Sequence, residues 1–433
     1  MSKTVWVFQT GEPLPIDTNG SRAMRAMSLS DSLVRLGHRV VLWSADFNHS
    51  EHRHRFGRRT RIHVSDRMEV RLLSSQGYDN NLGVQRVIDH AQLALDLRRV
   101  LQYEAPPDVA FVGFPPIEPA AYMGRWLTRH RVPFMVDVKD AWPDIFLRAF
   151  PKRLGVVGRA ALAPHDWMTR RCFERATALS SISDEFLLWS ANRAGRPVSA
   201  LDRVTPLTAP APSAEPADSR DDQFWNDLGV PNDGEFRVFF VGTLHSSYDW
   251  VPVAEAARTT GVQVVIGGDG SRSEEVRTLM SGLPNVVMPG WVTAGQAEAL
   301  AQRCSVALAP IAAHPDYVMS VPNKFYDAWA KGLPIVTGLT GAVERVIADH
   351  GVGAVYGVNS EDLGEILLRL RADRALVSEM GRRAQRLYVD QFDHRAVYDT
   401  LAASLVELAN RDVDAIGAGK PERVIDKHFE GAT

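Results

Sequence analysis

Short apolar runs alternate with amphipathic stretches along the first half of the chain. The apolar runs predict strands at residues 5–8, 40–43, 109–112, 134–138 and 178–182. The stretches between them predict helices near residues 22–36, 86–104, 118–131, 155–175 and 184–194. Strand–helix alternation of this kind favours a parallel sheet that is covered by helices on both faces.

The alternation is interrupted once and then begins again. Residues 209–218 are rich in Pro, Ala and acid, a composition that favours an extended linker or exposed loop. Further strands are predicted at 238–241, 262–266, 286–288, 306–309 and 334–337, followed by helices near 360–371, 375–390 and 394–410. We therefore predict an α/β fold with two doubly wound, Rossmann-like parallel-sheet domains that face each other across a cleft.

The predicted boundaries follow from this pattern. They are an N-terminal domain at 1–205, a linker at 206–235, a C-terminal domain at 236–392, a helix at 393–410 that could pack back on the first domain, and a polar tail at 411–433. A chain of 433 residues exceeds the size at which a single core keeps growing, which agrees with two domains.

The composition is that of an ordinary globular protein, with 45% hydrophobic and 23% charged residues. No apolar run approaches the roughly 20 residues that cross a bilayer, and the N-terminus has no signal-peptide pattern. Cys172 and Cys304 lie far apart, and the 13 His show no metal-ligand spacing. We expect a cytoplasmic protein with no metal site and no tightly bound cofactor.

The charge is unevenly distributed. Residues 1–205 contain 29 Lys and Arg against 21 Asp and Glu, whereas the remainder contains 20 against 31. The densest basic run is at 53–61. A solvated loop is one interpretation of this run, and contact with anionic lipid at the membrane surface is the other. Nucleic acid is not expected as a partner because no recognised binding module accompanies the charge.

The segment Ser320–Thr337 carries the clearest chemical signal. Pro322 is typical of a helix start and Gly332 of a helix end, and a short strand follows. Lys324 lies one turn before Asp327, so the two charges share a face. Free amides at the helix start, including that of Asn323, together with a lysine would bind an anion. An acid one turn further on could hold a sugar hydroxyl, so a sugar linked to a polyphosphate suits the segment.

Two glycine-containing loops follow strands of the second domain. Gly268 and Gly270 lie in the first of these, where glycine permits close approach of backbone to a ligand. This loop lacks both the dinucleotide and the P-loop patterns, so a tight turn is an equal alternative. Gly242 and Thr243 follow another strand and could offer amides and a hydroxyl to a phosphate, unless they only cap a helix.

Two loops of the first domain combine charge with glycine, proline or tryptophan. Asp137–Asp144 follows a strand, and either Asp140 or Asp137 could hold an acceptor hydroxyl as base or orienting group. A salt-bridged loop is the alternative. The long loop 11–22 opens a helix, where Gly20 would let a sugar or phosphate approach. Arg22 and Arg25 could contact phosphate, and solvated arginines are an equal alternative.

The motifs at 137–144 and 320–334 resemble those of the GT-B glycosyltransferases of retaining family four. The similarity extends over about residues 4–405 and is greatest to bacterial O-antigen and exopolysaccharide enzymes typified by the fucosamine transferases. The loop 266–270 resembles the donor-side glycine loop of the family, and 285–291 its base-binding segment.

This resemblance implies a nucleotide-diphosphate sugar bound mainly to the C-terminal domain. Lys324 would neutralise the diphosphate, and Asp327 would hold the ribose as the second acid of the Glu-x7-Glu pair. Two positions depart from the family pattern. Met319 replaces the first acid of that pair, and Thr243 occupies the usual arginine position. Phosphate neutralisation would therefore depend more heavily on Lys324.

The expected activity is transfer of a hexosyl or N-acetylhexosaminyl group to a glycan or lipid-linked acceptor hydroxyl, with retention, in bacterial surface polysaccharide or glycoconjugate synthesis. We expect it at the cytoplasmic side, with peripheral membrane contact as an option and no metal requirement. Two alternatives remain open at this stage. They are a GT-B sugar-nucleotide epimerase or hydrolase, and a non-catalytic scaffold of the same shape.

Overall fold

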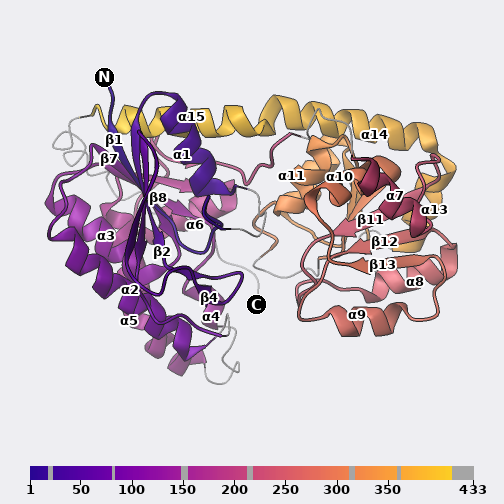
Figure 1. The fold of residues 1–433 in the computed structure, drawn as a ribbon, viewed down its shortest axis with the longest axis horizontal. Helices are drawn as coiled ribbons and strands as arrows, with labels where there is room; N and C mark the ends of the chain where they lie inside the picture. The colour runs from indigo at the N-terminus through magenta and orange to yellow at the C-terminus, as the bar shows by residue number, and fades with distance from the viewer. Residues whose placement is uncertain are drawn as a thin grey trace, which may run out of the picture. The chain divides into compact units, whose positions relative to one another are not determined.

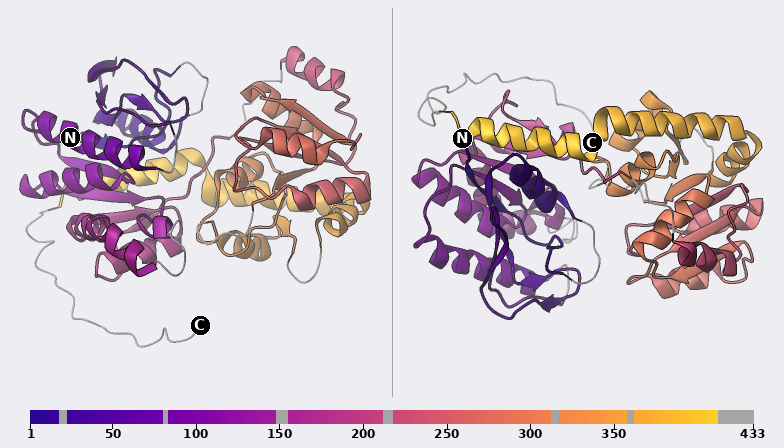
Figure 2. Two further views of the ribbon diagram at one scale, coloured as in Figure 1. Left: turned by 90° about the horizontal axis from the view of Figure 1, so that it is seen from below. Right: turned by 45° about the horizontal axis from the view of Figure 1, so that its top comes forward.

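The structure is a computed structural model that describes residues 1–17, 23–79, 83–147, 155–211, 218–311, 317–357 and 362–411. The chain divides into two compact units. The first, here the N-terminal domain, comprises the described parts of 1–16, 23–204 and 400–411. The second, the C-terminal domain, comprises the described part of 205–399. Figures 1 and 2 show that each contains a sheet flanked by helices.

An eight-stranded sheet forms the centre of the N-terminal domain, in the order β10-β9-β8-β7-β1-β2-β6-β5. Its strands are β1 (Thr4–Phe8), β2 (Arg39–Ala45), β5 (Thr60–Ser65), β6 (Met68–Leu73), β7 (Val109–Phe114), β8 (Phe134–Val138), β9 (Ala178–Ser181) and β10 (Arg203–Val204). All neighbours pair in parallel except β5, which is antiparallel to β6. A separate antiparallel pair joins β3 (Phe47–Asn48) to β4 (Arg53–His54).

Helices cover this sheet because its strands are apolar on both faces. The helices are α1 (Arg25–Arg35), α2 (Val84–Leu101), α3 (Ile117–Arg129), α4 (Asp144–Leu147), α5 (Gly155–Arg175) and α6 (Asp184–Arg193). Helices α2, α3 and α5 pack next to one another (Figure 1). Their buried side chains form one cluster with Trp6, Phe8 and Trp43 of the sheet.

The sheet of the C-terminal domain has six strands, in the order β13-β12-β11-β14-β15-β16, and all of its pairs are parallel. The strands are β11 (Arg237–Val241), β12 (Gln263–Gly267), β13 (Val286–Gly290), β14 (Val306–Ala309), β15 (Ile335–Thr337) and β16 (Gly353–Val355). The strand order reverses beside β11, and ligands bind at such switch points in open parallel sheets.

Two buried clusters in the C-terminal domain lie between its sheet and its helices. The helices are α7 (Ser219–Asp227), α8 (Val251–Thr260), α9 (Ser273–Met280), α10 (Ala294–Arg303), α11 (Asn323–Ala330), α12 (Ala342–His350), α13 (Leu363–Ala372), α14 (Arg374–Leu387) and α15 (His394–Leu408), with a π-helical turn η2 (Tyr388–Phe392) before the last. None of the helices that the structure describes is both long enough and apolar enough to span a bilayer.

The described residues of the predicted linker, 206–211 and 218–235, group with the C-terminal domain. They include α7, which packs against α10. Trp225 is fully buried, and its indole N–H donates to the carbonyl of Gln296 at 2.8 Å. Ala209 is also buried, and its carbonyl accepts from the hydroxyl of Tyr388 at 2.7 Å. The composition of the segment concealed these anchors because Trp225 is the only buried residue of α7, which is otherwise rich in charged and polar residues.

Helix α15 is divided between the domains. Residues up to Asp399 belong to the C-terminal domain, and residues from Thr400 onward belong to the N-terminal domain. Near its end, the carbonyl of Ala409 accepts a hydrogen bond from Lys3 Nζ at 3.4 Å. The predicted polar tail lies outside the described residues, apart from Arg411.

Candidate functional sites

Glycines allow two loops at the carboxyl ends of β11 and β12 to touch. Gly242 has φ +156° and Gly268 has φ +137°, values that side-chain-bearing residues rarely adopt. A Cβ on Gly268 would lie 2.0 Å from the carbonyl oxygen of Gly242. A Cβ on Gly270 would lie 2.4 Å from the carbonyl oxygen of Leu244. Close packing of the two loops therefore requires these glycines. This packing is compatible both with a tight turn and with a loop that binds a ligand.

Lys324 reaches this pair of loops from the start of α11. Its ammonium donates to the carbonyl of Val241 and lies 4.1 Å from the centre of the Phe240 ring. A Cβ on Gly242 would lie 2.2 Å from Lys324 Nζ. Burial and the charge of Lys324 lower the pKa of His245, which places this imidazole in the same cluster. A positive charge therefore stands at the carboxyl end of β11, beside the strand-order reversal.

Helix α11 begins and ends as the sequence predicts. Pro322 is its N-cap, with φ −65° and no side-chain hydrogen bond to the first amides. Gly332 follows its end with φ +66°, and Leu333 N donates to the carbonyl of Ala328 at 3.0 Å. Asn323, the first helical residue, is half-buried. An anion at this helix start would therefore meet backbone amides as well as Lys324.

The other predicted donor residues lie near this edge in different surroundings. Thr243 is exposed, directly after Gly242. Asp327 is half-buried one turn along α11 from Lys324, and its charge acts on Tyr388, whose pKa is raised mainly by burial. Met319 is half-buried, whereas Asp316 lies outside the described residues.

The sequence analysis missed one further glycine at this edge. Gly341 lies between β15 and α12 with φ +85°, and a Cβ there would lie 2.3 Å from the carbonyl oxygen of Val318. Its amide donates to the Glu344 carboxylate at 3.2 Å. The spacing of Gly338 and Gly341 between a strand and a helix was a usable signal.

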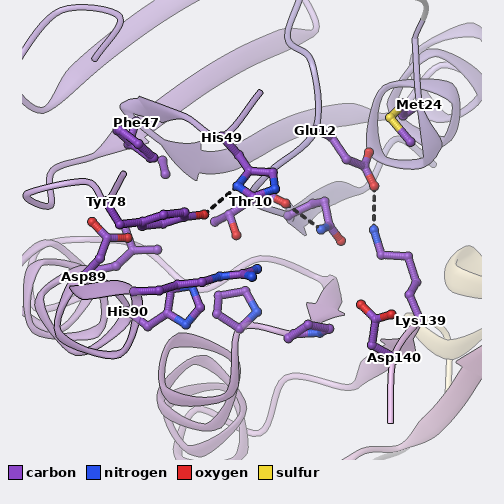
Figure 3. A pocket seen from close by; sticks show the side chains of 17 residues that line it. Thr10, Glu12, Met24, Phe47, His49, Tyr78, Asp89, His90, Lys139 and Asp140 are labelled. Carbon is purple, nitrogen blue, oxygen red and sulfur yellow. Dashed lines mark hydrogen bonds and ion pairs between the residues drawn. The ribbon is translucent and has the colours of Figure 1, made fainter. Parts of the chain in front are cut away.

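The N-terminal domain contains a pocket of about 210 Å³ at the carboxyl ends of β1, β2, β7 and β8. Figure 3 shows Phe47, Tyr78 and Asp89 on one side of it and Glu12, Lys139 and Asp140 on the other. The residues that line it are Gln9, Thr10, Gly11, Glu12, Met24, Ala45, Phe47, His49, Tyr78, Arg86, Asp89, His90, Leu93, Pro115, Pro116, Lys139 and Asp140.

Glu12 fixes one side of this pocket. Its carboxylate accepts from Lys139 Nζ at 2.6 Å and from the amide of Ala26, in the first turn of α1, at 2.8 Å. An acid near a helix start is stabilised by the helix dipole. The ion pair joins the loop after β1 to the loop after β8, so it holds the rim of the pocket in place.

A cluster of imidazole, phenol and guanidinium groups forms the opposite side. His49 Nδ1 and the hydroxyl of Tyr78 are 2.7 Å apart. The Arg86 guanidinium lies 5.5 Å from the centre of the Tyr78 ring. Burial, with the charge of Arg86, lowers the pKa of His49 to about 4, and burial lowers the pKa of His90 to about 4. Both imidazoles are therefore uncharged at neutral pH.

The sequence analysis did not predict this cluster, because its residues come from segments that are far apart in the sequence. His49 follows β3, Tyr78 follows β6, and Arg86 and His90 lie on α2. Their positions after strands were a weak signal, because only the fold shows which strand ends are adjacent.

The two acids proposed for the first domain have different surroundings. Asp140 is exposed and lines the pocket. Asp137 is fully buried in β8 and pairs with Arg25, whose guanidinium donates to its two oxygens at 2.6 and 2.5 Å. Asp137 is therefore held in a buried ion pair and is not among the residues that line the pocket, and its catalytic role stays a prediction. Gly20 and Arg22 lie outside the described residues.

Acidic side chains form ion pairs with several arginines of the basic run at 53–61 and so offset much of its positive charge. Arg53 pairs with Glu51, and Arg59 pairs with Asp96 at 3.2 Å. Arg61 lies 3.1 Å from Glu69. The arginines of these pairs are exposed and their acids are buried or half-buried. The pairs reduce the charge available to a membrane surface, and lipid contact stays a prediction. Within the described ranges, no group of three or more His, Cys, Asp and Glu is placed to hold a metal ion.

One family model matches the part of the chain that carries Lys324. Residues 235–373 match the family model described as glycosyl transferases group 1. This segment includes both glycine loops and all of α11. No protein with a curated function matches the chain by sequence.

Solved structures resemble the chain over almost its whole length. Sucrose-phosphate synthase from Thermosynechococcus elongatus has a TM-score of 0.67 at 12% identity and covers 94% of this chain and 99% of its own. Anabaena HepE in complex with UDP-glucose has a TM-score of 0.61 at 15% identity, covering 94% and 100%. WaaG, a glycosyltransferase involved in lipopolysaccharide biosynthesis, has a TM-score of 0.60 at 13% identity, covering 93% and 99%. At these identities the likeness shows the fold alone, which is GT-B.

Proposed function

We propose that this protein is a glycosyltransferase that moves a sugar from a nucleotide-diphosphate donor to an acceptor hydroxyl. One observation carries the proposal. The ammonium of Lys324 lies against Gly242 at the carboxyl end of β11, inside the segment that matches the group 1 glycosyltransferases. The complex of HepE with UDP-glucose supports a nucleotide-sugar donor by likeness of fold.

The donor would bind with its diphosphate at Lys324 and the first amides of α11. The glycines at 242, 268 and 270 would let the donor approach the backbone, and Thr243 would offer a hydroxyl. Asp327, on the same face of α11 as Lys324, would accept from the ribose hydroxyls. Because Met319 supplies no second acid, the charge balance of the site would depend on Lys324.

In the proposed reaction, the bond between the anomeric carbon and the phosphate oxygen breaks as the bond to the acceptor oxygen forms on the same face. The transition state has oxocarbenium character, and the leaving nucleoside diphosphate gains negative charge. Lys324 and the helix amides would stabilise that charge more strongly than they stabilise the bound donor, which lowers the barrier. The acceptor proton would pass to the leaving phosphate, so the enzyme needs no nucleophile.

Neutralisation by Lys324 and amides would allow transfer without a divalent cation. An assay with and without a chelator tests this part of the proposal. Equal turnover is expected, and loss of turnover with the chelator, restored by Mg²⁺ or Mn²⁺, would contradict it.

The acceptor would occupy the pocket of the N-terminal domain, with Asp140 orienting its reacting hydroxyl. A role in surface polysaccharide or glycoconjugate synthesis on the cytoplasmic side, with a glycan or lipid-linked acceptor, is our proposal for the biological context. The resemblance to bacterial O-antigen enzymes supports it, as does the fold shared with WaaG.

A thermal-shift screen with UDP-, GDP-, dTDP- and ADP-sugars tests the donor class. A ligand that binds only the folded state adds about 2.7 kcal/mol to its stability at a hundredfold excess over Kd. One nucleotide family should raise the melting temperature, and Asp327→Asn should reduce that shift more than it affects acceptor binding. Binding of no nucleotide sugar would contradict the proposal. Binding without turnover on any acceptor would favour a scaffold, and full-rate consumption of donor alone would favour a hydrolase or epimerase.

A further inference from the structure

The pocket of the N-terminal domain offers hydrogen-bonding groups of every kind. Arg86 and Lys139 only donate, whereas the carboxylates of Glu12, Asp89 and Asp140 only accept. Thr10 and the neutral imidazoles of His49 and His90 can do both. An anion needs donors and a cation needs acceptors. A sugar hydroxyl both donates and accepts, so a mixed lining of this kind suits hydroxyl groups.

We propose that this pocket binds one uncharged, hexose-sized sugar ring, and that this ring is the accepting unit of the acceptor. The role of this sugar as the acceptor rests on the proposed transfer reaction. The sugar-binding site itself is inferred only from the residues that line the pocket.

The size of the pocket supports a single ring. Its volume of about 210 Å³ is small for a ligand site. Drug-sized ligands occupy pockets of about 300–1,000 Å³. An oligosaccharide would therefore place one unit in the pocket and extend outside it.

The lining carries charges of both signs, so a charged group on the ligand would face a like charge. Three carboxylates and two cations give a formal net charge of −1, because the two imidazoles are uncharged at neutral pH. Lys139 is already paired with Glu12 at 2.6 Å. A carboxylate or phosphate on the sugar would meet Asp140 and Asp89, whereas an ammonium group would meet Arg86 and Lys139.

Aromatic and amide groups complete the fit to a sugar. Phe47 and Tyr78, with ring centres 4.9 Å apart, both line the pocket and offer apolar surface to the C–H groups of a ring. Gln9 is 4% exposed and lines the same pocket. Its side-chain amide donates to the carbonyl of Thr10 at 2.8 Å, which holds this side chain in the wall of the pocket.

Saturation-transfer difference NMR with methyl glycosides tests the inference on the full chain without any donor. The probes are the methyl glycosides of glucose, galactose and mannose, each compared with its uronide and with its 2-amino-2-deoxy analogue. At least one neutral glycoside should bind, and its charged counterparts should bind at least about tenfold more weakly, because like charges that face each other are costly. Binding of no neutral glycoside, or tighter binding of a charged one, would overturn the inference.

A charge-reversal variant separates this site from adventitious binding. Asp140→Lys changes the formal charge of the lining from −1 to +1, and should shift the preference toward the uronide by at least about tenfold. Asp140 is exposed, so the fold should tolerate the change. The matched control is Asp66→Lys at the fully exposed turn between β5 and β6. An unchanged preference in Asp140→Lys, or the same shift in Asp66→Lys, would count against the site.

The outcomes also distinguish this inference from the proposed function. Neutral glycosides that bind while no nucleotide sugar binds would leave the sugar site in place and remove the transfer reaction. A nucleotide sugar that is turned over only with a charged acceptor would retain the transfer reaction and overturn the neutral-sugar assignment.

Discussion

Two aspartates three positions apart show how local surroundings decide a role. Asp137 lies within β8, where both sheet faces are covered, and its carboxylate is fully buried against Arg25. Asp140 lies beyond the end of the strand, is exposed and lines the pocket. The sequence shows two acids in one motif. The structure distinguishes them, because β8 ends between the buried Asp137 and the exposed Asp140.

Substitution of these two aspartates should therefore have opposite effects. Asp137→Asn leaves the Arg25 guanidinium buried without its counter-charge, which should cost about 3–5 kcal/mol of stability. Asp140→Asn should change stability by less than about 0.5 kcal/mol, as exposed substitutions do, but should impair acceptor use. Urea denaturation measures the first effect and a transfer assay the second. Similar stability losses in both variants would contradict this account.

His90 makes stability depend on pH in a defined direction. Its pKa of about 4 in the folded protein lies below the ordinary value of 6.5. Between these values the unfolded chain binds more protons, so stability should decrease as pH falls from 6.5 to 4, by at most about 1.4 kcal/mol per pH unit for this group.

His165 acts in the opposite sense, through the carboxylate of Glu118, which also lies 3.9 Å from His90 Nδ1. Its hydrogen bond to Glu118 raises its pKa, so its contribution is present below pH 6.5 and is lost as pH rises through its folded pKa. His90→Gln should reduce the decrease between pH 6.5 and 4 without abolishing it, because His49, with a pKa of about 4, contributes in the same sense. Urea denaturation at several pH values measures the change. A decrease of equal slope in His90→Gln would contradict the assignment to His90.

At the scale of elements, predictability followed the strength of the apolar pattern. The strands of the parallel sheets that read as continuous apolar runs were predicted within a few residues, as was α11. Strand β6 was missed because Glu69 and Arg71 interrupt its apolar residues. In the fold, Arg71 pairs with both Glu69 and Glu104, so these charges cost little in a sheet. The helix α7 was missed because Trp225 is its one large buried residue.

The candidate sites were predictable to different degrees for a similar reason. Lys324 and its glycines lie close to strand and helix boundaries that the sequence marks with Pro and Gly. The pocket of the N-terminal domain brings together side chains from the ends of several strands and from α2, and strand order cannot be read from spacing alone.

The contact between the two glycine loops gives a prediction for these elements. Gly268→Ala should be more destabilising than Gly282→Ala by more than about 1 kcal/mol, because it adds a backbone clash to the strain of a positive φ. Gly282 has φ +77° and nothing within 4 Å of a Cβ, so it controls for strain alone. Urea denaturation compares them, and nucleotide-sugar binding should be lost only in Gly268→Ala. Equal costs in the two variants would show that the loops do not touch.

For the whole molecule, the notable feature is that the chain returns to its first domain at the end. Leu405 is fully buried in the part of α15 that belongs to the N-terminal domain, whereas Leu370 of α13 is fully buried in the C-terminal domain. The residues after Thr400 are therefore expected to unfold with the first 200 residues and not with the domain that precedes them.

Differential scanning calorimetry can assign the two domains by this feature. Leu405→Ala and Leu370→Ala should each cost about 2–5 kcal/mol through the cavity they leave. Leu405→Ala should lower the transition temperature of the N-terminal domain, and Leu370→Ala should lower that of the C-terminal domain. A nucleotide sugar should raise the transition temperature of the C-terminal domain. Leu405→Ala lowering the nucleotide-sensitive transition would contradict the division of α15.

The central claim is that the Lys324 ammonium stabilises the charge on a leaving diphosphate. The most direct measurement is release of nucleoside diphosphate by Lys324→Gln, with a bound donor and its acceptor, compared with Lys331→Gln. Lys331 caps the other end of α11 and pairs with Glu298 at 2.6 Å, so it is a matched lysine outside the site. Lys324→Gln should lower turnover by on the order of 10²-fold or more with the fold intact, and Lys331→Gln should leave it nearly unchanged. Equal turnover in Lys324→Gln and the unsubstituted protein would contradict the claim.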